Sequence, residues 1–104
     1  MPLRTAHRLS FFSAIDYEAN AAAIDAAAAA GVTVISVDSA VNSDNVAAYI
    51  GADNYGAGRM AAQSALDGTA GTLCVGLINY EVNGANGRDR EQGARDAFAE
   101  SGRA

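Results

Sequence analysis

A helix-forming run that leads directly into a short β-branched run constrains this chain most. Residues 18–31, EANAAAIDAAAAAG, consist mainly of Ala, the best helix former, and end on a glycine. Residues 32–37, VTVISV, follow at once and are apolar without strict alternation, which is typical of a strand buried on both faces. A second run of this kind, TLCVGLI, occupies residues 72–78. We expect Asp16 to cap the helix, which would then begin at Tyr17.

The rest of the chain continues the alternation of helices and strands. VAAYI at residues 46–50 predicts a short strand, and a helix is expected from about Asn54 to Leu66. A last helix is expected from Gly87 to Gly102, with Asn86 as its cap. This order predicts an α/β fold built on a parallel sheet. In such sheets ligands bind at the carboxyl ends of the strands, where helices begin.

Composition excludes several kinds of function. The formal net charge is −5 and all seven basic residues are Arg, so no basic patch for a nucleic acid is expected. One histidine, His7, and one cysteine, Cys74, supply neither a metal site nor an internal disulfide, and we expect Cys74 to be a buried, inert thiol. No spacing indicates a nucleophile with its base or an acid–base pair. We therefore expect no enzyme activity and no cofactor.

The chain is also short for an independent fold. Its 104 residues make one small domain at most, and much of the apolar half is Ala, so the core should be thin. No apolar stretch is long enough to span a membrane. The start, MPLRTAHRLSFF, has no continuous apolar region, and we expect no signal peptide within it. These features indicate part of something larger.

Asp38 is the first candidate ligand residue. It ends the predicted strand 32–37, at the edge of the sheet where ligands bind. A carboxylate at that place can accept hydrogen bonds from two hydroxyl groups of a sugar. The alternative is an ordinary turn aspartate that caps the following loop.

Arg90 is the second candidate. It falls in the first turn of the last predicted helix, where the helix dipole disfavours a cation. It shares a face with three residues that should enter the core, namely Ala94, Ala97 and Phe98. We expect Arg90 to project over the strand ends and to bond a ligand or a buried carboxylate. The alternatives are an ion pair with Asp89 or Glu91, or simple snorkelling.

Gly56 and Gly58 superficially suggest a nucleotide-binding loop. Their spacing is not G-x-G-x-x-G, and they do not follow a long strand directly. Close packing of a helix start against neighbouring backbone explains these glycines better.

Three segments resemble a known family in their order and spacing. They are AIDAAAAAGVTVISVDSAV, AYIGADNYGAGRMAAQSAL and GRDREQGARDAFAESG. Together they cover roughly residues 14–102 and resemble the type I periplasmic binding proteins, more narrowly the ribose-type sugar-binding components of ABC transporters. The family pattern is "GIPVV-x-x-D-S", then "IGTDN", "GxxAG" in a helix, a strand, and "RxxGF" opening a helix.

The resemblance implies an incomplete periplasmic-binding-protein-like I fold, the end of lobe one plus the start of lobe two. Residues 13–50 would belong to the first lobe, 51–54 to a hinge crossing and 55–104 to the second lobe, with residues 1–12 unmatched. LSFFSAID, at residues 9–16, would be the remains of one strand. Intact members are much longer and carry further strands and aromatic sugar contacts. We therefore expect the isolated chain to bind a monosaccharide weakly or not at all.

The resemblance also assigns residue roles. Asp38 resembles the family aspartate that holds sugar hydroxyls from the first lobe, and Arg90 the arginine that reaches the sugar from the second. The remaining candidates are the cleft-lining Asn83 and Asn86 and the hinge residues Gly51, Asp53 and Asn54.

The implied function is sugar binding for an ABC importer, with its permease as partner and a periplasmic or extracellular location. The effector domain of a lac-repressor-type regulator shares the fold and stays open as an alternative. A nucleotide-binding α/β enzyme fragment is a further alternative, although VDSAVNSD offers no phosphate loop after the first strand. Strands without neighbours have unpaired edges, so the chain could also self-associate or fold only on pairing with another chain.

Overall fold

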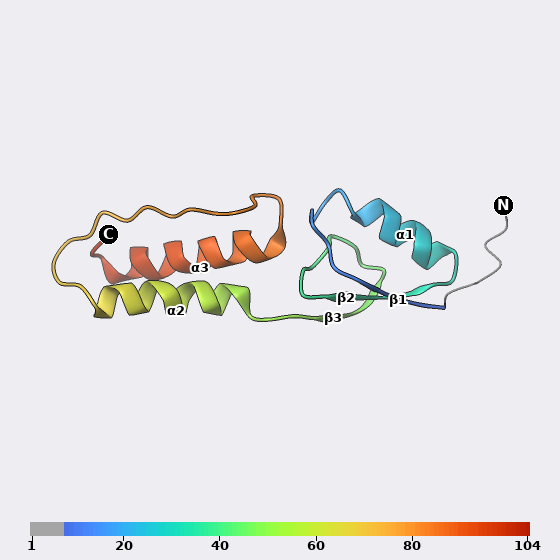
Figure 1. Ribbon diagram of the computed structural model, residues 1–104, viewed down its shortest axis with the longest axis horizontal. Helices are drawn as coiled ribbons and strands as arrows, with labels where there is room; N and C mark the ends of the chain where they lie inside the picture. Colours follow the sequence, from blue (N-terminus) through green and yellow to red (C-terminus); the bar gives the residue numbers. More distant parts are fainter. Residues whose placement is uncertain (1–7) are drawn as a thin grey trace. The chain divides into compact units, whose positions relative to one another are not determined.

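The computed structural model describes residues 8–104 (Figure 1). The described elements are β1 (Leu9–Phe12), α1 (Ala21–Ala29), β2 (Thr33–Val37), β3 (Val46–Ile50), α2 (Asn54–Asp67) and α3 (Ala85–Ser101). The chain forms two compact units. One runs to Ala52 and includes Asn83–Ala85, and the other comprises Asp53–Val82 and Asn86–Ala104.

The first unit is a small parallel α/β layer. Its sheet has the strand order β1-β2-β3, and β2 pairs in parallel with both neighbours. Leu9 lies opposite Thr33, and Val37 lies opposite Ile50. The helix α1 connects β1 to β2, as in other parallel sheets. The predicted α/β fold with a parallel sheet is therefore confirmed, and β1 shows that residues 9–12 belong to it.

A small apolar cluster holds α1 onto this sheet. Ile24 of α1 is 4% exposed and Val34 of β2 is 1% exposed, and both belong to one cluster with Ala14 and Val41. Only Ile24 of α1 is buried, because the helix is otherwise almost entirely Ala. The first unit thus has the thin core that its composition predicts.

The helix α1 starts later than predicted. It begins at Ala21, after Asn20, and the Asp16 carboxylate accepts hydrogen bonds from the backbone N–H groups of Glu18 and Ala19, at 2.9 and 2.7 Å. Asp16 therefore caps a separate turn that precedes the helix. The predicted start at Tyr17 was wrong, because this turn satisfies the N–H groups before the helix begins.

The second unit contains the helices α2 and α3, which lie side by side (Figure 1). Ala62 and Leu66 of α2 pack against three buried residues of α3, namely Ala94, Ala97 and Phe98. The helix α2 ends one residue beyond its predicted end. The helix α3 begins at Ala85, so Asn86 lies inside its first turn and is not its cap.

Two glycines allow α2 and α3 to approach closely. A Cβ atom added at Gly58 would collide with the carbonyl oxygen of Arg90, and one added at Gly93 would collide with the carbonyl oxygen of Tyr55. Gly58 therefore serves the close packing that the sequence predicted.

Residues 72–78 form no strand in the described structure. They run as an extended segment, and their Leu73 N–H donates a 2.6 Å hydrogen bond to the carbonyl oxygen of Arg103. Three apolar side chains of the segment remain exposed, namely Val75, Leu77 and Ile78. The predicted strand was wrong because a strand requires a neighbour, and the described chain supplies none here.

Cys74 lies in this segment and is exposed. The prediction of a buried thiol was therefore wrong. It depended on a strand covered on both faces, which residues 72–78 do not form.

Within residues 8–104, no helix is both long enough and apolar enough to cross a membrane.

Candidate functional site

Asp38 follows β2 directly and adopts a left-handed backbone conformation, with φ at 62°. Its N–H donates to the Ile50 carbonyl oxygen at 2.8 Å, and its own carbonyl oxygen accepts from the Tyr49 hydroxyl at 2.8 Å. Aspartate tolerates this conformation better than most residues. The end of β3 thus fixes the Asp38 backbone, while the residue itself is exposed.

Gly51 makes this arrangement possible. A Cβ atom at this position would collide with the Tyr49 hydroxyl and would lie 2.8 Å from the Asp38 carbonyl oxygen. Only glycine leaves room for the Tyr49 ring and the Asp38 backbone together. The sequence indicated Gly51 as a hinge residue, but it did not predict that Gly51 packs against the Tyr49 ring and the Asp38 backbone.

Arg90 is held by one nitrogen. Its Nε donates to the Oδ1 atom of Asn54 at 2.8 Å. Asn54 in turn donates from Nδ2 to the Oδ1 atom of Asn86 at 3.0 Å. Neither terminal nitrogen of Arg90 has a partner within the described residues. The alternative ion pairs of Arg90 with Asp89 or Glu91 are therefore not formed.

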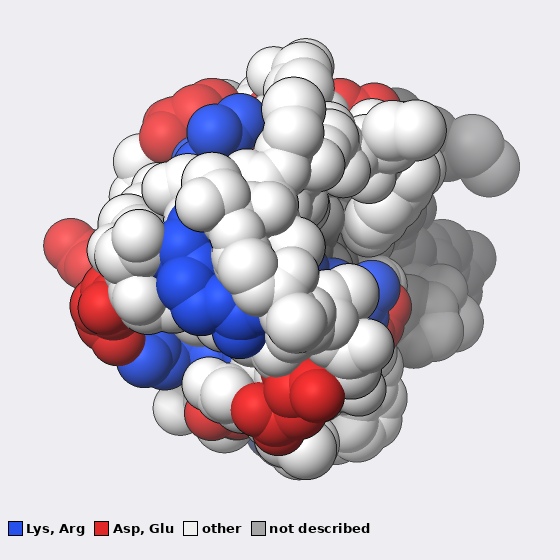
Figure 2. Space-filling model, turned by 90° about the vertical axis from the view of Figure 1, so that its left-hand side faces the viewer, with Lys and Arg blue, Asp and Glu red and all other residues white. Residues whose placement is uncertain are grey.

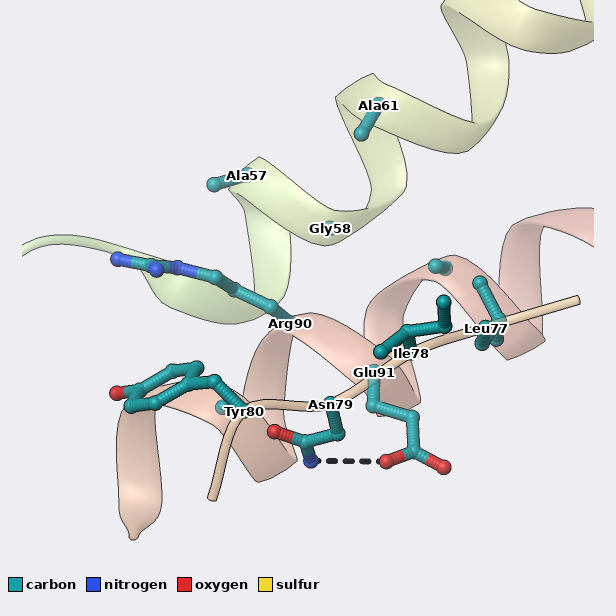
Figure 3. A pocket seen from close by; sticks show the side chains of 11 residues that line it. Ala57, Gly58, Ala61, Leu77, Ile78, Asn79, Tyr80, Arg90 and Glu91 are labelled. Carbon is teal, nitrogen blue, oxygen red and sulfur yellow. Dashed lines mark hydrogen bonds between the residues drawn. The ribbon is translucent and has the colours of Figure 1, made fainter. Parts of the chain in front are cut away.

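An open groove of about 320 Å³ runs beside Arg90 in the second unit (Figure 3). The helices α2 and α3 and residues 77–80 form its walls. In Figure 3 the outer ends of Arg90 and Tyr80 point to the same side, away from Leu77 and Ile78. The Tyr80 side chain is 73% exposed.

Sequence reasoning missed Tyr80. An aromatic residue just after the apolar run 72–78 is the signal that could have found it, by the rule that selected Asp38.

The other candidates lie as follows. The Asp53 carboxylate caps α2 by accepting from the Gly56 N–H at 2.8 Å. Asn54 and Asn86 are 5% and 6% exposed. The Asn83 carbonyl oxygen accepts from the Tyr17 N–H at 3.0 Å within the first unit, and the residue is exposed. The structure thus brings Arg90, Asn54 and Asn86 together, whereas Asp38 and Asn83 belong to the other unit.

Hydrogen bonds favour the charged form of Glu91, whose carboxylate lies beside the groove. Asn79 donates from Nδ2 to the Oε2 atom of Glu91 at 2.9 Å, and Arg95 forms an ion pair with the same carboxylate at 2.8 Å. The Asn79 bond and then the Arg95 bond lower the pKa of Glu91 below its ordinary value. Glu91 therefore contributes a fixed negative charge to the groove wall.

Charges of both signs alternate on the face of the molecule that Figure 2 shows. Arginines stand among acidic side chains there, and no continuous basic area forms among the described residues on that face. Within residues 8–104, no group of three or more His, Cys, Asp or Glu side chains is placed to hold a metal ion.

The comparisons with known proteins define the class. Residues 11–103 match the periplasmic binding protein domain family. The match covers most of the chain, and the chain belongs to this family. No curated protein matches the chain.

Solved structures of sugar-binding relatives are similar to it. The Caulobacter myo-inositol binding protein bound to myo-inositol matches over 92% of this chain and 33% of its own, with 27% identity and a TM-score of 0.85. The periplasmic component of a Hahella chejuensis ABC-type sugar transport system matches over 84% and 32%, with 25% identity and a TM-score of 0.80. A fructose-binding periplasmic domain of a hybrid two-component system matches over 89% and 31%, with 29% identity and a TM-score of 0.77. The chain spans about a third of the length of each.

Proposed function

We propose that this chain is part of the sugar-binding component of an ABC importer and that Asp38 and Arg90 hold its ligand. The observation that carries the proposal is the state of Arg90, which is fixed through Nε and offers both terminal nitrogens without a protein partner in the described part of the chain. The family match and the sugar-binding neighbours support the same function.

The two side chains suit a polyol. The Asp38 carboxylate accepts hydrogen bonds, and the guanidinium of Arg90 donates two in parallel, which matches a pair of adjacent hydroxyl groups. The exposed Tyr80 ring offers an apolar face beside Arg90 for the C–H groups of a sugar ring. Asn83 is a further candidate contact. The ligand class is therefore a monosaccharide or a similar polyol.

The mechanism is binding without chemistry or cofactor. Residues 51–54 would form a hinge in the intact protein, with Gly51, Asp53 and Asn54 as its residues and the ligand trapped on closure. The division of the chain into units between Ala52 and Asp53 supports this placement. The intact protein would lie in the periplasm and deliver its ligand to a transporter permease.

A second partner is favoured by one comparison. The fructose-binding neighbour is a domain of a hybrid two-component system, so a protein of this fold can also serve a sensor. Genes for a permease and an ATPase beside the reading frame would favour transport, and a histidine kinase gene in their place would favour sensing.

Calorimetric titration with myo-inositol, fructose, ribose and xylose tests the ligand class. Because the chain spans only about a third of the length of its sugar-binding neighbours, we expect a Kd of about 1 mM or weaker for the best ligand. Asp38→Asn and Arg90→Gln should each weaken it further, while Asp67→Asn, at the exposed end of α2 and outside the groove, serves as the control. Sedimentation should accompany the titration because unpaired strand edges favour self-association. Micromolar binding by a monomer would overturn the expectation.

A further inference from the structure

Two buried amides lie behind Arg90. Asn54 is the first residue of α2 and Asn86 the second residue of α3, and both are nearly inaccessible to solvent. They form a relay in which Arg90 donates to Asn54 and Asn54 donates to Asn86, at 2.8 and 3.0 Å. The relay therefore connects the starts of both helices to one guanidinium.

The burial of Asn54 and Asn86 indicates that their amides have a role beyond filling space between the helices. A buried amide costs free energy unless its polar atoms are bonded, and an apolar pair would fill a helix contact at lower cost. The Asn54 amide offers its oxygen to Arg90 and its nitrogen to Asn86, so each side of it is used. The two hydrogen bonds of the Asn54 amide therefore hold the Arg90 side chain at its Nε atom.

We propose that Asn54 and Asn86 are positioning residues that hold the Arg90 guanidinium ready for ligand. The inference rests on the proposed function and deepens it. In this account Asn86 acts through Asn54 and does not touch the ligand, and Asn54 serves Arg90 in addition to any part in the hinge.

The chemistry follows from the fork of the guanidinium. Arginine has five N–H donors, and the relay uses the one on Nε. The four on the terminal nitrogens remain for ligand in the described structure. An arginine side chain loses considerable rotamer freedom when a ligand immobilises it, so holding it beforehand preserves affinity. The fixed fork selects ligands with two adjacent oxygens, the vicinal diol of a polyol.

The proposal is tested first without any sugar. The Arg90 Nε–H signal in a proton–nitrogen spectrum, assigned by its loss in Arg90→Gln, should exchange slowly with water in the parent chain. Asn54→Ala should speed this exchange at least tenfold, whereas Asn54→Asp keeps an acceptor for Nε and should keep it slow. Asn79→Ala is the matched control, since it removes another amide of the same groove that does not contact Arg90.

Affinity supplies the second readout. In Asn54→Ala the Arg90 side chain is no longer held before the ligand binds, so we expect a Kd about 3- to 10-fold weaker for the best polyol. The Kd of Asn54→Asp should stay within about twofold of that of the parent chain. If Asn54→Ala does not fold, Asn86→Ala replaces it, with faster Nε–H exchange expected. Unchanged Arg90 exchange in the folded variants would overturn the proposal, as would unchanged affinity despite faster exchange. If no polyol binds the parent chain even at about a hundred times the expected millimolar Kd, the proposed ligand class is wrong. The exchange rate still decides whether Asn54 holds Arg90.

Discussion

At the scale of single residues, the features that matter most surround Asp38. Its backbone has a positive φ, and hydrogen bonds to Ile50 and Tyr49 fix both of its peptide groups. Non-glycine residues in this conformation cost free energy and persist only where the surroundings impose them. The end of β3 imposes it here, at the carboxyl end of β2, which is the edge where parallel sheets generally bind ligands.

Gly51→Ala should disturb this arrangement. The added methyl group would collide with the Tyr49 hydroxyl, so the ring must leave the Asp38 carbonyl oxygen. Overpacking of this kind costs about 1–3 kcal/mol, to be measured as a lower urea midpoint by circular dichroism. Tyr49→Phe, which removes the hydroxyl alone, should cost about 1 kcal/mol. A Gly51→Ala chain as stable as the parent would show that the site has more room than we describe.

At the scale of elements, the second unit depends on how closely α2 and α3 approach. Backbone carbonyl groups lie where the side chains of Gly58 and Gly93 would otherwise be. On the exposed side, Arg59 of α2 binds Glu100 of α3 through both terminal nitrogens, and the Tyr55 hydroxyl donates to Asp96 at 2.6 Å. The pairing of these helices therefore combines backbone contact with polar contacts at the rim.

Gly58→Ala should separate the helices. The new methyl group meets the Arg90 backbone, which cannot move without shifting α3, so we expect a loss of about 1–3 kcal/mol in the free energy of unfolding. Gly68→Ala is the matched control at the end of the same helix, where φ is −82° and a Cβ atom would meet only ordinary contacts. It should be neutral or slightly stabilising. Urea unfolding measures the free energy of unfolding of both variants. If Gly58→Ala is as stable as Gly68→Ala, the close packing at Gly58 is contradicted.

Acid should weaken the same helix pair. The Arg59 bond lowers the pKa of Glu100, and the Tyr55 bond lowers that of Asp96, from ordinary values of 4.5 and 3.8. A carboxyl group with a lowered pKa in the folded state stabilises the fold above its unfolded pKa, and this contribution is lost as pH falls through the folded pKa. Melting temperatures should therefore begin to fall near pH 4.5 and continue to fall below pH 3.8.

The acid effect has its own control. Glu100→Gln should flatten the fall in melting temperature below pH 4.5, and Asp89→Asn, outside this network, should leave it unchanged. Since the pairs are exposed, added salt should reduce the effect. A melting curve with the same pH dependence in Glu100→Gln would show that the Arg59 pair contributes nothing.

The particular elements show how far sequence reasoning reaches. The strands β2 and β3 and the helix α2 lie within a residue or so of their predictions, because β-branched runs and helix-forming runs determine them locally. Residues 72–78 have an equally clear strand pattern, but residues 8–104 offer them no neighbouring strand to pair with. Sequence reasoning placed Arg90 in the first turn of the last helix, whereas α3 begins at Ala85 and Arg90 lies beyond its first turn, with Nε bonded to Asn54 at the start of α2. It could not find the buried relay through Asn54 and Asn86, because burial there depends on how α2 packs on α3.

At the scale of the whole molecule, the chain belongs to the periplasmic binding protein domain family and spans a third of its solved neighbours. The chain carries Asp38 in one unit and Arg90 in the other. The central claim is that these two side chains recognise the same ligand. In the isolated chain we expect that recognition to be weak, because the chain spans only about a third of the length of its sugar-binding neighbours.

Chemical-shift mapping of the labelled chain with myo-inositol, up to about a hundred times the expected millimolar Kd, tests this claim most directly. We predict that the amide signals of Asp38 and Ser39 and the side-chain signals of Arg90 shift along one common binding curve. Each of the variants Asp38→Asn and Arg90→Gln should move the binding curves of both sets of signals to higher ligand concentration. Shifts confined to one unit, or shifts that persist unchanged in both variants, would contradict the account.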